Sequence, residues 1–273
     1  WHSATTKGEF LAPDGKAADW VPETKRQVEK GYGKWIYYLT LASALPSEES
    51  VSPFDRVTKG RLRAYVDLLT NQGLASQTIA SRLTDLCEAL RVMCPSCDLT
   101  VIKHLVSVLN MRATPSRNKA ARIKHPFEIW GAACKAMDDA HTTDELTPLH
   151  RSCAYRDALA LGLLALRPIR LKNLTQLTLS EHLRFDGSQW QCSFSGCETK
   201  DKQPLHFALP TDVTFVTCFE RYLTEHRPVL LRDPHDEKAG ILPSQLTGPL
   251  WISTRRKRMS QQSLYCNICQ LSE

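Results

Sequence analysis

The sequence lacks any uninterrupted run of about 18 apolar residues, the length that a helix needs to cross a bilayer. Its longest apolar candidate, residues 158–166, has about half that length and is typical of a core helix. The chain also begins without a charged segment followed by an apolar one, so we see no signal peptide. We therefore expect no contact with a membrane.

The chain also has no cysteine arrangement that is typical of a zinc knuckle or a redox motif. Its ten cysteines include two C-x-x-C pairs, Cys94/Cys97 and Cys266/Cys269, but about 170 residues separate the pairs. Zinc sites usually close with His or Cys ligands that lie much nearer in the sequence. We therefore expect free thiols, as in a reducing compartment, and no metal site.

No internal repeat and no low-complexity tract is present. A hydrophobic content of 42% and a charged content of 23% are ordinary for a globular protein, and 273 residues suffice for two domains with separate cores. The chain starts at Trp1 and stops just after what resembles the middle of a helix. We expect both ends to be cuts in a longer protein.

The net charge of +6 is unevenly distributed along the chain. Residues 1–124 hold 18 lysines and arginines against 12 aspartates and glutamates, whereas the cations and anions of residues 125–273 cancel. The stretch 99–124 contains no acid, and each phosphate that a cation neutralises releases counterions from a nucleic acid. We take its six cations as candidate DNA-binding residues, with a solvated helix face and linker as the alternative: Lys103, Arg112, Arg117, Lys119, Arg122 and Lys124.

Residues 20–118 are expected to form a helical domain after an irregular lead-in, residues 1–19. The third predicted helix has the clearest amphipathic stripe, with apolar residues at alternating steps of four and three. A basic segment with two prolines, residues 113–126, then breaks the pattern and holds the domain boundary. The helices predicted before it, which favour a compact bundle, cover residues 22–44, 58–69, 76–92 and 99–111.

Residues 119–273 are expected to form a second domain with both helices and strands. The predicted order is two helices, three short strands joined by polar turns, a helix that begins after Thr211, an extended run and a last helix near Ser260. The fold class is therefore mainly α with a small antiparallel β-sheet (α+β). The first five of these elements cover residues 127–140, 148–167, 177–183, 190–194 and 204–209, and the extended run covers residues 250–253.

Arg170 follows a helix that is apolar on all sides and ends at Pro168. A cation in this place either pairs with nearby carbonyls and acids or binds an anionic ligand such as a phosphate. Asn173 follows three residues later, and Arg167 is the competing cation. We take Arg170 as the first candidate catalytic residue.

Lys200 lies at a polar turn between two strand-like runs, in the segment ETKDKQPLHFALP. A lysine on a hairpin suits general-acid chemistry, because closing over a ligand removes water from its head group and lowers its pKa. A solvated turn lysine is the alternative, and Lys202 is near enough to serve instead. We take Lys200 as the second candidate catalytic residue.

These two segments resemble the arginine box and the lysine hairpin of the tyrosine recombinase (phage integrase) family. In that family an acid or an amide follows the arginine after three residues, and Asn173 fills this position, where Glu or Asp is commoner. The runs DVTFVTCFERYLTEHRPVLL and LWISTRRKRMSQQSLYCNI resemble the course of the family after the hairpin. The resemblance covers about residues 20–273.

The resemblance implies a site-specific DNA recombinase or integrase. Residues 20–118 would be its core-binding domain, which clamps the duplex, and residues 119–273 the first part of its catalytic domain, incomplete at the C-terminal end. In the parent a tyrosine attacks a phosphodiester, Arg170 would stabilise the charge of the transition state, and Lys200 would protonate the leaving 5′-oxygen. The implied partner is double-stranded DNA, on which the family assembles as a homotetramer without any cofactor. The implied location is cytoplasmic and nucleoid-associated, or nuclear in a eukaryote.

The later motifs of the family are absent from the sequence. None of the nine histidines starts an H-x-x-R motif, and we expect Tyr222 and Tyr265 to be ordinary helix residues. We therefore expect the chain to bind DNA without cutting it, and leave open whether it is an enzyme. Two alternatives remain: a non-catalytic DNA-binding protein of recombinase shape, and a helical adaptor unrelated to DNA.

Overall fold

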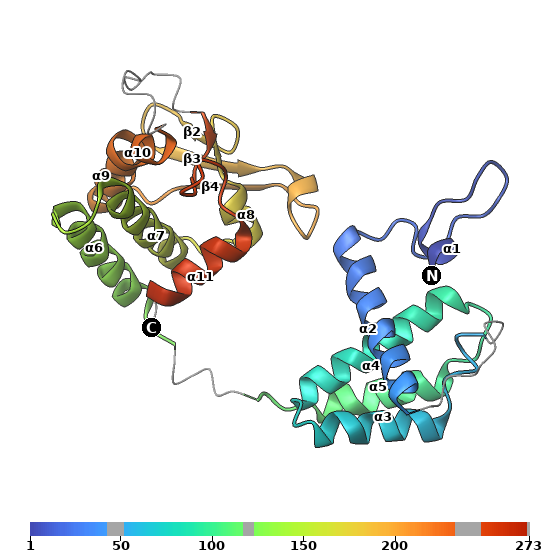
Figure 1. Ribbon diagram of the computed structural model, residues 1–273. Helices are drawn as coiled ribbons and strands as arrows, with labels where there is room; N and C mark the ends of the chain where they lie inside the picture. The colour runs from blue at the N-terminus through green and yellow to red at the C-terminus, as the bar shows by residue number, and fades with distance from the viewer. Residues whose placement is uncertain (43–51, 117–122, 233–246, 272–273) are drawn as a thin grey trace. The chain divides into compact units, whose positions relative to one another are not determined.

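The structure, a computed structural model, describes residues 1–42, 52–116, 123–232 and 247–271 (Figure 1). The chain divides into two units, unit 1 with residues 1–122 and unit 2 with residues 123–273. The domain boundary predicted after residue 118 lies outside the described residues. None of the described helices combines the length and the apolar character that crossing a membrane requires.

Unit 1 is helical, and the four predicted helices are present within a few residues of their expected bounds. They are α2 (Pro22–Leu41), α3 (Lys59–Asn71), α4 (Ser76–Met93) and α5 (Thr100–Arg112). Pro22 occupies the first turn of α2, where its missing N–H costs no hydrogen bond. The Thr58 side chain accepts a hydrogen bond from the backbone N–H of Arg61 and caps α3.

The core of unit 1 forms around α4, which packs against α2, α3 and α5. The predicted stripe of α4 is buried throughout, and three aromatic rings from α2 and α3 pack against one another beside it. The stripe is Ile79, Leu83, Leu86 and Leu90, and the rings are those of Trp35, Tyr38 and Tyr65.

The prediction that residues 1–19 are irregular is wrong in part. A one-turn helix, α1 (His2–Thr5), begins the chain, and Ala4 and Ala17 are buried against Val92 at the end of α4. The ammonium group of Lys25 on α2 donates hydrogen bonds of 2.8 Å to the carbonyls of Thr5 and Ala18. Two small alanine side chains and the Lys25 ammonium group thus hold residues 1–19 against the helices of unit 1. Such contacts have no helical or strand period, so the sequence pattern did not predict them.

Unit 2 is built around α7 (Pro148–Leu166), which packs against α6 (Pro126–Thr142), α10 (Arg227–Leu231) and α11 (Gln261–Leu271). α7 is buried over its second half, as its apolar sequence predicted. Three further helical segments follow it: α8 (Leu171–Gln176), α9 (Val213–Arg221) and the π-helix η3 (Tyr222–His226).

The expected antiparallel sheet is instead a mixed five-stranded sheet, with the strand order β4-β3-β2-β1-β5. The predicted strand 177–183 is two strands, β1 (Thr178–Leu179) and β2 (Leu183–Phe185), which pair in parallel at Leu179 and Leu183. Ser180 between them has a φ of 68°, in the left-handed region, so the chain makes a tight loop and continues in the same direction. The other strands, β3 (Trp190–Phe194), β4 (Leu205–Ala208) and β5 (Gly248–Pro249), pair antiparallel.

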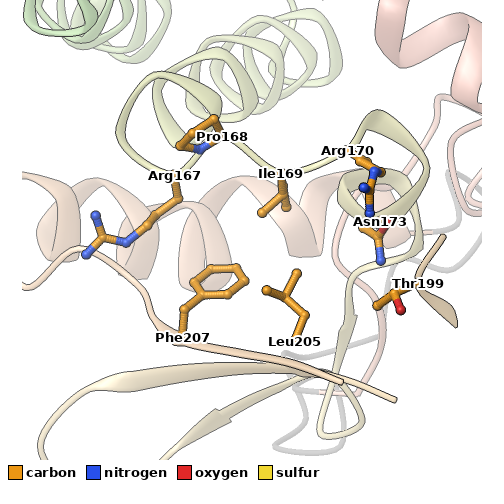
Figure 2. Close-up of a pocket in the computed structure, with 8 residues that line it drawn as sticks. All are labelled: Arg167, Pro168, Ile169, Arg170, Asn173, Thr199, Leu205 and Phe207. Atoms are coloured by element: carbon orange, nitrogen blue, oxygen red, sulfur yellow. The ribbon is translucent and has the colours of Figure 1, made fainter. Parts of the chain in front are cut away.

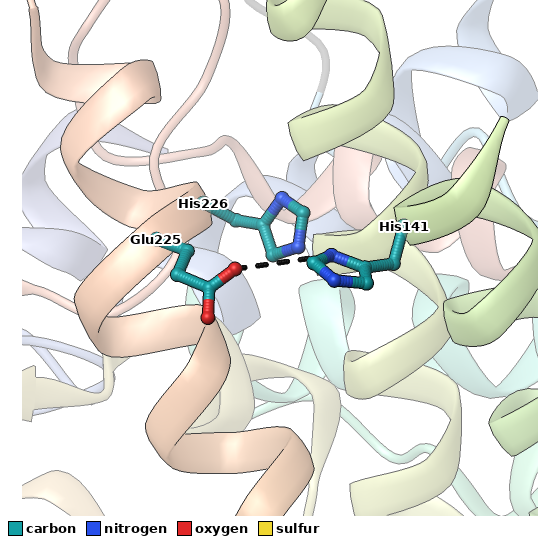
Figure 3. Close-up of side chains that lie close together, drawn as sticks. All are labelled: His141, Glu225 and His226. Carbon is teal, nitrogen blue, oxygen red and sulfur yellow. Dashed lines mark ion pairs between the residues drawn. The ribbon is translucent and has the colours of Figure 1, made fainter. Parts of the chain in front are cut away.

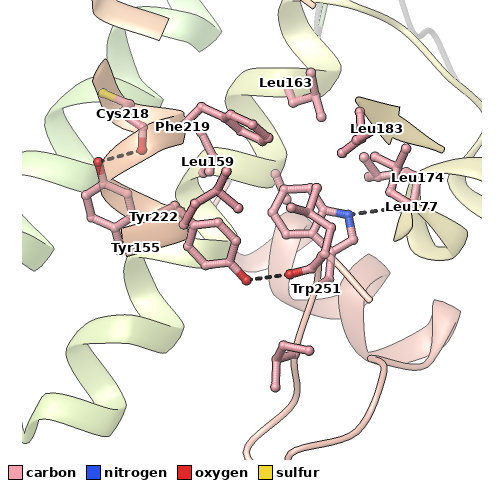
Figure 4. Close-up of a cluster of buried hydrophobic side chains, with 14 of the residues drawn as sticks. Tyr155, Leu159, Leu163, Leu174, Leu177, Leu183, Cys218, Phe219, Tyr222 and Trp251 are labelled. Atoms are coloured by element: carbon pink, nitrogen blue, oxygen red, sulfur yellow. Dashed lines mark hydrogen bonds between the residues drawn. The ribbon is translucent and has the colours of Figure 1, made fainter. Parts of the chain in front are cut away.

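Buried aromatic side chains close the core of unit 2, and three of them, Tyr155, Tyr222 and Trp251, donate hydrogen bonds to backbone carbonyls (Figure 4). The Tyr155 hydroxyl donates to the carbonyl of Cys218 at 3.1 Å, and the Tyr222 hydroxyl donates to the carbonyl of Leu250 at 2.8 Å. The indole N–H of Trp251 donates to the carbonyl of Leu174 at 2.8 Å. These bonds tie α7 to α9, η3 to the segment after β5, and that segment to α8.

Candidate functional site

The end of α7 positions Arg170. The helix stops at Leu166 because Pro168 cannot continue it, and Arg170, two residues after Pro168, is the N-cap of α8. Although Arg170 follows a buried helix, its guanidinium is half-exposed, with 51% of its side-chain surface in contact with solvent. Arg170 therefore has access to a ligand from outside.

The connection between β3 and β4, residues 195–204, lies against Arg170. The guanidinium of Arg170 donates to both carboxylate oxygens of Asp201, at 3.2 and 2.9 Å, although 31 residues separate the two in sequence. The sequence left open whether Arg170 pairs with a nearby acid, and in the structure it pairs with Asp201. Exposed ion pairs contribute only about 0–1 kcal/mol, so a stronger anion can displace the carboxylate.

A compact turn shapes this connection. Ser195 and Glu198 form a capping box around the 3₁₀-helix η2 (Gly196–Glu198), and His182 makes a 2.7 Å contact with the Glu198 carboxylate. Hydrogen bonds from Ser195 and then from His182 lower the pKa of Glu198 to about 2. A Cβ atom at Gly196 would lie 2.6 Å from the backbone oxygen of Lys202, so this close approach requires glycine. The connection is therefore held in one shape.

Lys200 lies on this connection and is exposed. Among the described residues its ammonium group has no hydrogen-bond or ion-pair partner, and its sequence neighbour Asp201 is the residue that pairs with Arg170. Lys202, the alternative lysine, has a φ of 55°. The structure thus brings the two predicted catalytic residues to one edge of unit 2, through the pairing of Arg170 with the neighbour of Lys200.

A surface pocket of about 490 Å³ opens between the α7–α8 junction and the β3–β4 connection (Figure 2). Its polar lining includes Arg170, Thr199 and Asn173. Asn173 is only 3% exposed, and its amide Nδ2 has no hydrogen-bond partner among the described residues. A buried donor without a partner costs free energy, so a ligand acceptor in this pocket would stabilise it. Leu205 and Phe207 give the pocket an apolar wall.

Arg167, the competitor of Arg170, has a structural role. Its Nε donates to the carbonyl of Ala208 at 3.1 Å, and its Nη1 donates to the carbonyl of Leu166 at 3.1 Å. The side chain thereby ties the end of α7 to the end of β4. Arg167 therefore lines the pocket with its guanidinium bound to backbone carbonyls. Arg170, by contrast, is paired with the exposed carboxylate of Asp201, which another anion can replace.

The six predicted DNA-binding cations are only partly described. Arg117, Lys119 and Arg122 lie outside the described residues. Lys103 and Arg112 are exposed on α5, and nine residues separate them, which places them on opposite sides of an α-helix. Lys124 is exposed at the start of unit 2. The described cations therefore do not form one face of α5, as a phosphate-tracking strip would.

A second group of cations, which was not predicted as a site, forms the basic turn, residues 254–258. Arg255, Arg256, Lys257 and Arg258 are consecutive in the sequence, and this run was the available signal. The turn is tight, since the backbone N–H and the hydroxyl of Ser253 both donate to the carbonyl of Lys257. A pocket of about 440 Å³ opens beside it, lined by Ser253, Thr254, Arg255, Lys257, Arg258, Ser260 and Ser263.

The basic turn is anchored to the C-terminal end of α8. The Arg258 guanidinium donates to the carbonyl of Thr175 at 3.2 Å and to the hydroxyl of Thr178 at 2.9 Å. Because α8 has six residues and Arg170 is its N-cap, about 9 Å of helix separates the two groups of cations. Arg170 and the basic turn therefore mark the two ends of one short helix.

The pair Arg156–Asp157, which precedes the arginine box, is structural. Arg156 is 2% exposed and donates to both carboxylate oxygens of Asp157 at 2.9 Å and to the carbonyl of Ile252 at 2.5 Å. Asn267 on α11 donates to the same carboxylate. The pair connects α7, the segment before the basic turn and α11, and leaves no group free to bind a ligand.

No family model matches the chain. A search of the curated proteins likewise returns no match.

Proposed function

We propose that the chain is a DNA-binding protein of the tyrosine recombinase type, and that unit 2 contacts the phosphates of double-stranded DNA. The single observation that carries the proposal is the pocket beside α8. There, the guanidinium of Arg170, whose ion pair is exposed, the buried amide of Asn173, which has no partner within the described part of the chain, and the lysine-bearing connection come together. Guanidinium and amide N–H groups are the donors that hold phosphate oxygens in proteins.

The spacing of cations along α8 supports contact with a nucleic acid strand. The phosphates of one strand follow one another at about 3.4 Å along the duplex axis, so about 9 Å corresponds to two or three phosphates. Arg170 would bind one phosphate at the start of α8, and the exposed side chains Arg255 and Lys257 would bind another near its end. The +6 net charge, which residues 1–124 carry, favours the approach of such a polyanion to the chain as a whole.

Arg170 would exchange Asp201 for a phosphate. The oxygens of a phosphate accept hydrogen bonds from a guanidinium as those of Asp201 now do from Nη2, and the amide Nδ2 of Asn173 would donate a further bond. Release of Asp201 would break the contact between the tip of the β3–β4 connection and Arg170, next to the exposed Lys200. The lysine head would then move toward the same phosphate.

In the parent recombinase reaction these residues would act on the scissile phosphodiester. Attack by a tyrosine oxygen forms the new bond to phosphorus, and the 5′-oxygen leaves with the proton that Lys200 supplies. Arg170 would stabilise the charge on the non-bridging oxygens. Because the sequence contains no H-x-x-R motif, we propose that this chain binds DNA without cleaving it and that it self-associates on DNA.

Fluorescence anisotropy with a labelled duplex tests the proposal. Arg170→Gln removes one charge-assisted contact, worth about 1.5–3 kcal/mol, and should weaken binding about tenfold or more, and Lys200→Gln should weaken it less. The matched control, Lys135→Gln, removes an exposed cation of α6 that does not line the pocket and should leave the affinity unchanged. Equal affinities for all four proteins would contradict the proposal.

A second measurement separates DNA binding from strand cleavage. A suicide substrate, which traps a recombinase as a covalent adduct after the first cleavage, should give no adduct with this chain. A covalent adduct would contradict the non-cleaving assignment, and the absence of any DNA binding would favour the helical adaptor.

A further inference from the structure

His141, Glu225 and His226 lie together on the side of unit 2 formed by the end of α6 and the π-helix η3 (Figure 3). One ligand atom from each residue lies within 4.8 Å of those of the other two. We infer that these three side chains bind a divalent transition-metal ion of the zinc type. Two imidazoles and one carboxylate form a ligand set that Zn²⁺ takes in proteins, with a water molecule in the fourth position.

His226 is oriented as a metal ligand. The residue is 4% exposed, and its Nδ1 lies 3.3 Å from the hydroxyl of Ser152. Its ring stacks on Tyr155 at a centroid distance of 4.0 Å, which fixes the plane of the imidazole. Nε2 is buried and has no hydrogen-bond partner among the described residues. In metal sites, one imidazole nitrogen bonds to a neighbouring polar group while the other, left without a protein partner, binds the ion.

His141 and Glu225 lie at the exposed side of the cluster. Nδ1 of His141 is 3.8 Å from a carboxylate oxygen of Glu225, which is too long for a direct hydrogen bond. Two ligand atoms that each lie about 2.0–2.1 Å from a zinc ion are at most about 4 Å apart. Because both side chains are partly exposed, small rotations bring their ligand atoms to the distances that an ion requires.

The π-helix explains how two neighbouring residues reach one point. In an α-helix successive side chains point about 100° apart, whereas the wider turn of a π-helix reduces this angle. Pro228 follows η3, and in a regular α-helix its ring would clash with the carbonyl of Thr224, four residues earlier. The wider turn relieves this clash and presents Glu225 and His226 to His141 together.

The ligand set selects the class of ion. Two of its three ligand atoms are imidazole nitrogens and one is a carboxylate oxygen, whereas Mg²⁺ and Ca²⁺ are held by oxygen ligands. The site therefore favours an ion that binds imidazole strongly, such as Zn²⁺, over Mg²⁺ or Ca²⁺.

A metal ion here would join the C-terminal end of α6 to the α9–α10 segment. The sequence predicted no metal site, because these ligands come from two elements more than 80 residues apart and none of them belongs to a C-x-x-C pair. The site lies outside the pocket lined by Arg170, so the inference does not depend on DNA binding.

Titration of the full chain with Co²⁺ after treatment with a chelator tests the inference. We expect one saturable site whose visible spectrum shows nitrogen and oxygen ligands, without the thiolate-to-cobalt charge-transfer band that the cysteines would give. His141→Ala and Glu225→Gln change exposed side chains and should weaken this site at least about tenfold, and Zn²⁺ should displace Co²⁺ from it. Ser152→Ala, which removes the partner of Nδ1, should weaken it about tenfold.

Two matched controls keep the test specific. Glu220→Gln removes an exposed carboxylate on α9, and His104→Ala removes an exposed imidazole on α5, and both should leave the site unchanged. The inference is overturned if the wild-type chain shows no such site, if only thiolate-type binding is seen, or if His141→Ala and Glu225→Gln bind Co²⁺ as the wild type does.

Discussion

Replacing Asp157 by asparagine should destabilise unit 2 more than any surface change. The carboxylate accepts two hydrogen bonds from the buried Arg156 and one from Asn267. Burial alone lowers the pKa of Arg156, but the hydrogen bond and charge of Asp157 outweigh it, and the pKa is raised. Asp157→Asn therefore leaves a buried guanidinium without its counter-charge, which costs about 3–5 kcal/mol. This is a large part of the 5–15 kcal/mol that typically stabilises a domain.

The double variant Arg156→Met with Asp157→Leu should lose less than Asp157→Asn. It removes both charges together, so the buried guanidinium is no longer left unpaired. It still leaves the carbonyl of Ile252 without its donor, at a cost of about 1–3 kcal/mol. A double-mutant cycle that includes the single variants Arg156→Met and Asp157→Leu should therefore show strong coupling between the two positions.

Urea denaturation followed by circular dichroism measures the free energy of unfolding of each variant. Hydrogen exchange read by mass spectrometry on peptides of α7 and α11 assigns the loss to unit 2, because the two units need not unfold together. A loss below about 1 kcal/mol for Asp157→Asn, or a double variant as unstable as the sum of the single ones, would refute the reasoning.

Three further predictions follow from particular contacts. Gly162→Val should cost about 1–3 kcal/mol in thermal unfolding, because a Cβ atom there would lie 2.7 Å from the ring of Trp130. Glu198 has a folded-state pKa of about 2, below the usual value of about 4.3, so it stabilises unit 2 at neutral pH and this stabilisation disappears as the pH falls through that interval. Glu198→Gln should therefore make the free energy of unfolding depend less steeply on pH in the acid range. Asp201→Asn removes the competitor of the phosphate at Arg170 and should strengthen DNA binding several-fold in anisotropy measurements.

Each of these variants has a control of the same kind. Gly131→Ala adds a methyl group where nothing lies within 4 Å and should stabilise α6 by about 0.5–1 kcal/mol. Glu181→Gln should not change the acid profile as Glu198→Gln does, and Glu220→Gln should not strengthen DNA binding as Asp201→Asn does. A control that behaves like its variant would contradict the corresponding contact.

The helices could be predicted from the sequence because their signals are local. α4 was predicted at residues 76–92 and is Ser76–Met93, since its apolar stripe has the helical period along its whole length. Pro22 and Pro148 are likewise local signals, because proline is favoured in the first turn of a helix, and they lie in the first turns of α2 and α7.

The sheet and the sites depended on contacts that no local pattern encodes. The parallel pairing of β1 with β2 follows from a left-handed residue, Ser180, that is not glycine. The partner of Arg170 lies 31 residues away, and the metal ligands come from two separate elements. The basic turn was the exception, because its four consecutive cations were visible in the sequence.

The salt dependence of DNA affinity tests the central claim most directly. We predict that the logarithm of the affinity falls linearly with the logarithm of the salt concentration, with a slope of about −0.9 for each phosphate contacted. The double variant Arg255→Ala with Lys257→Ala should make the slope shallower by about 2, because it removes two exposed cations of the basic turn. Lys135→Ala with Arg232→Ala removes the same charge from α6 and the end of α10 and should leave the slope unchanged. A wild-type affinity that does not depend on salt, or the same change in slope for both double variants, would contradict DNA binding through the basic turn.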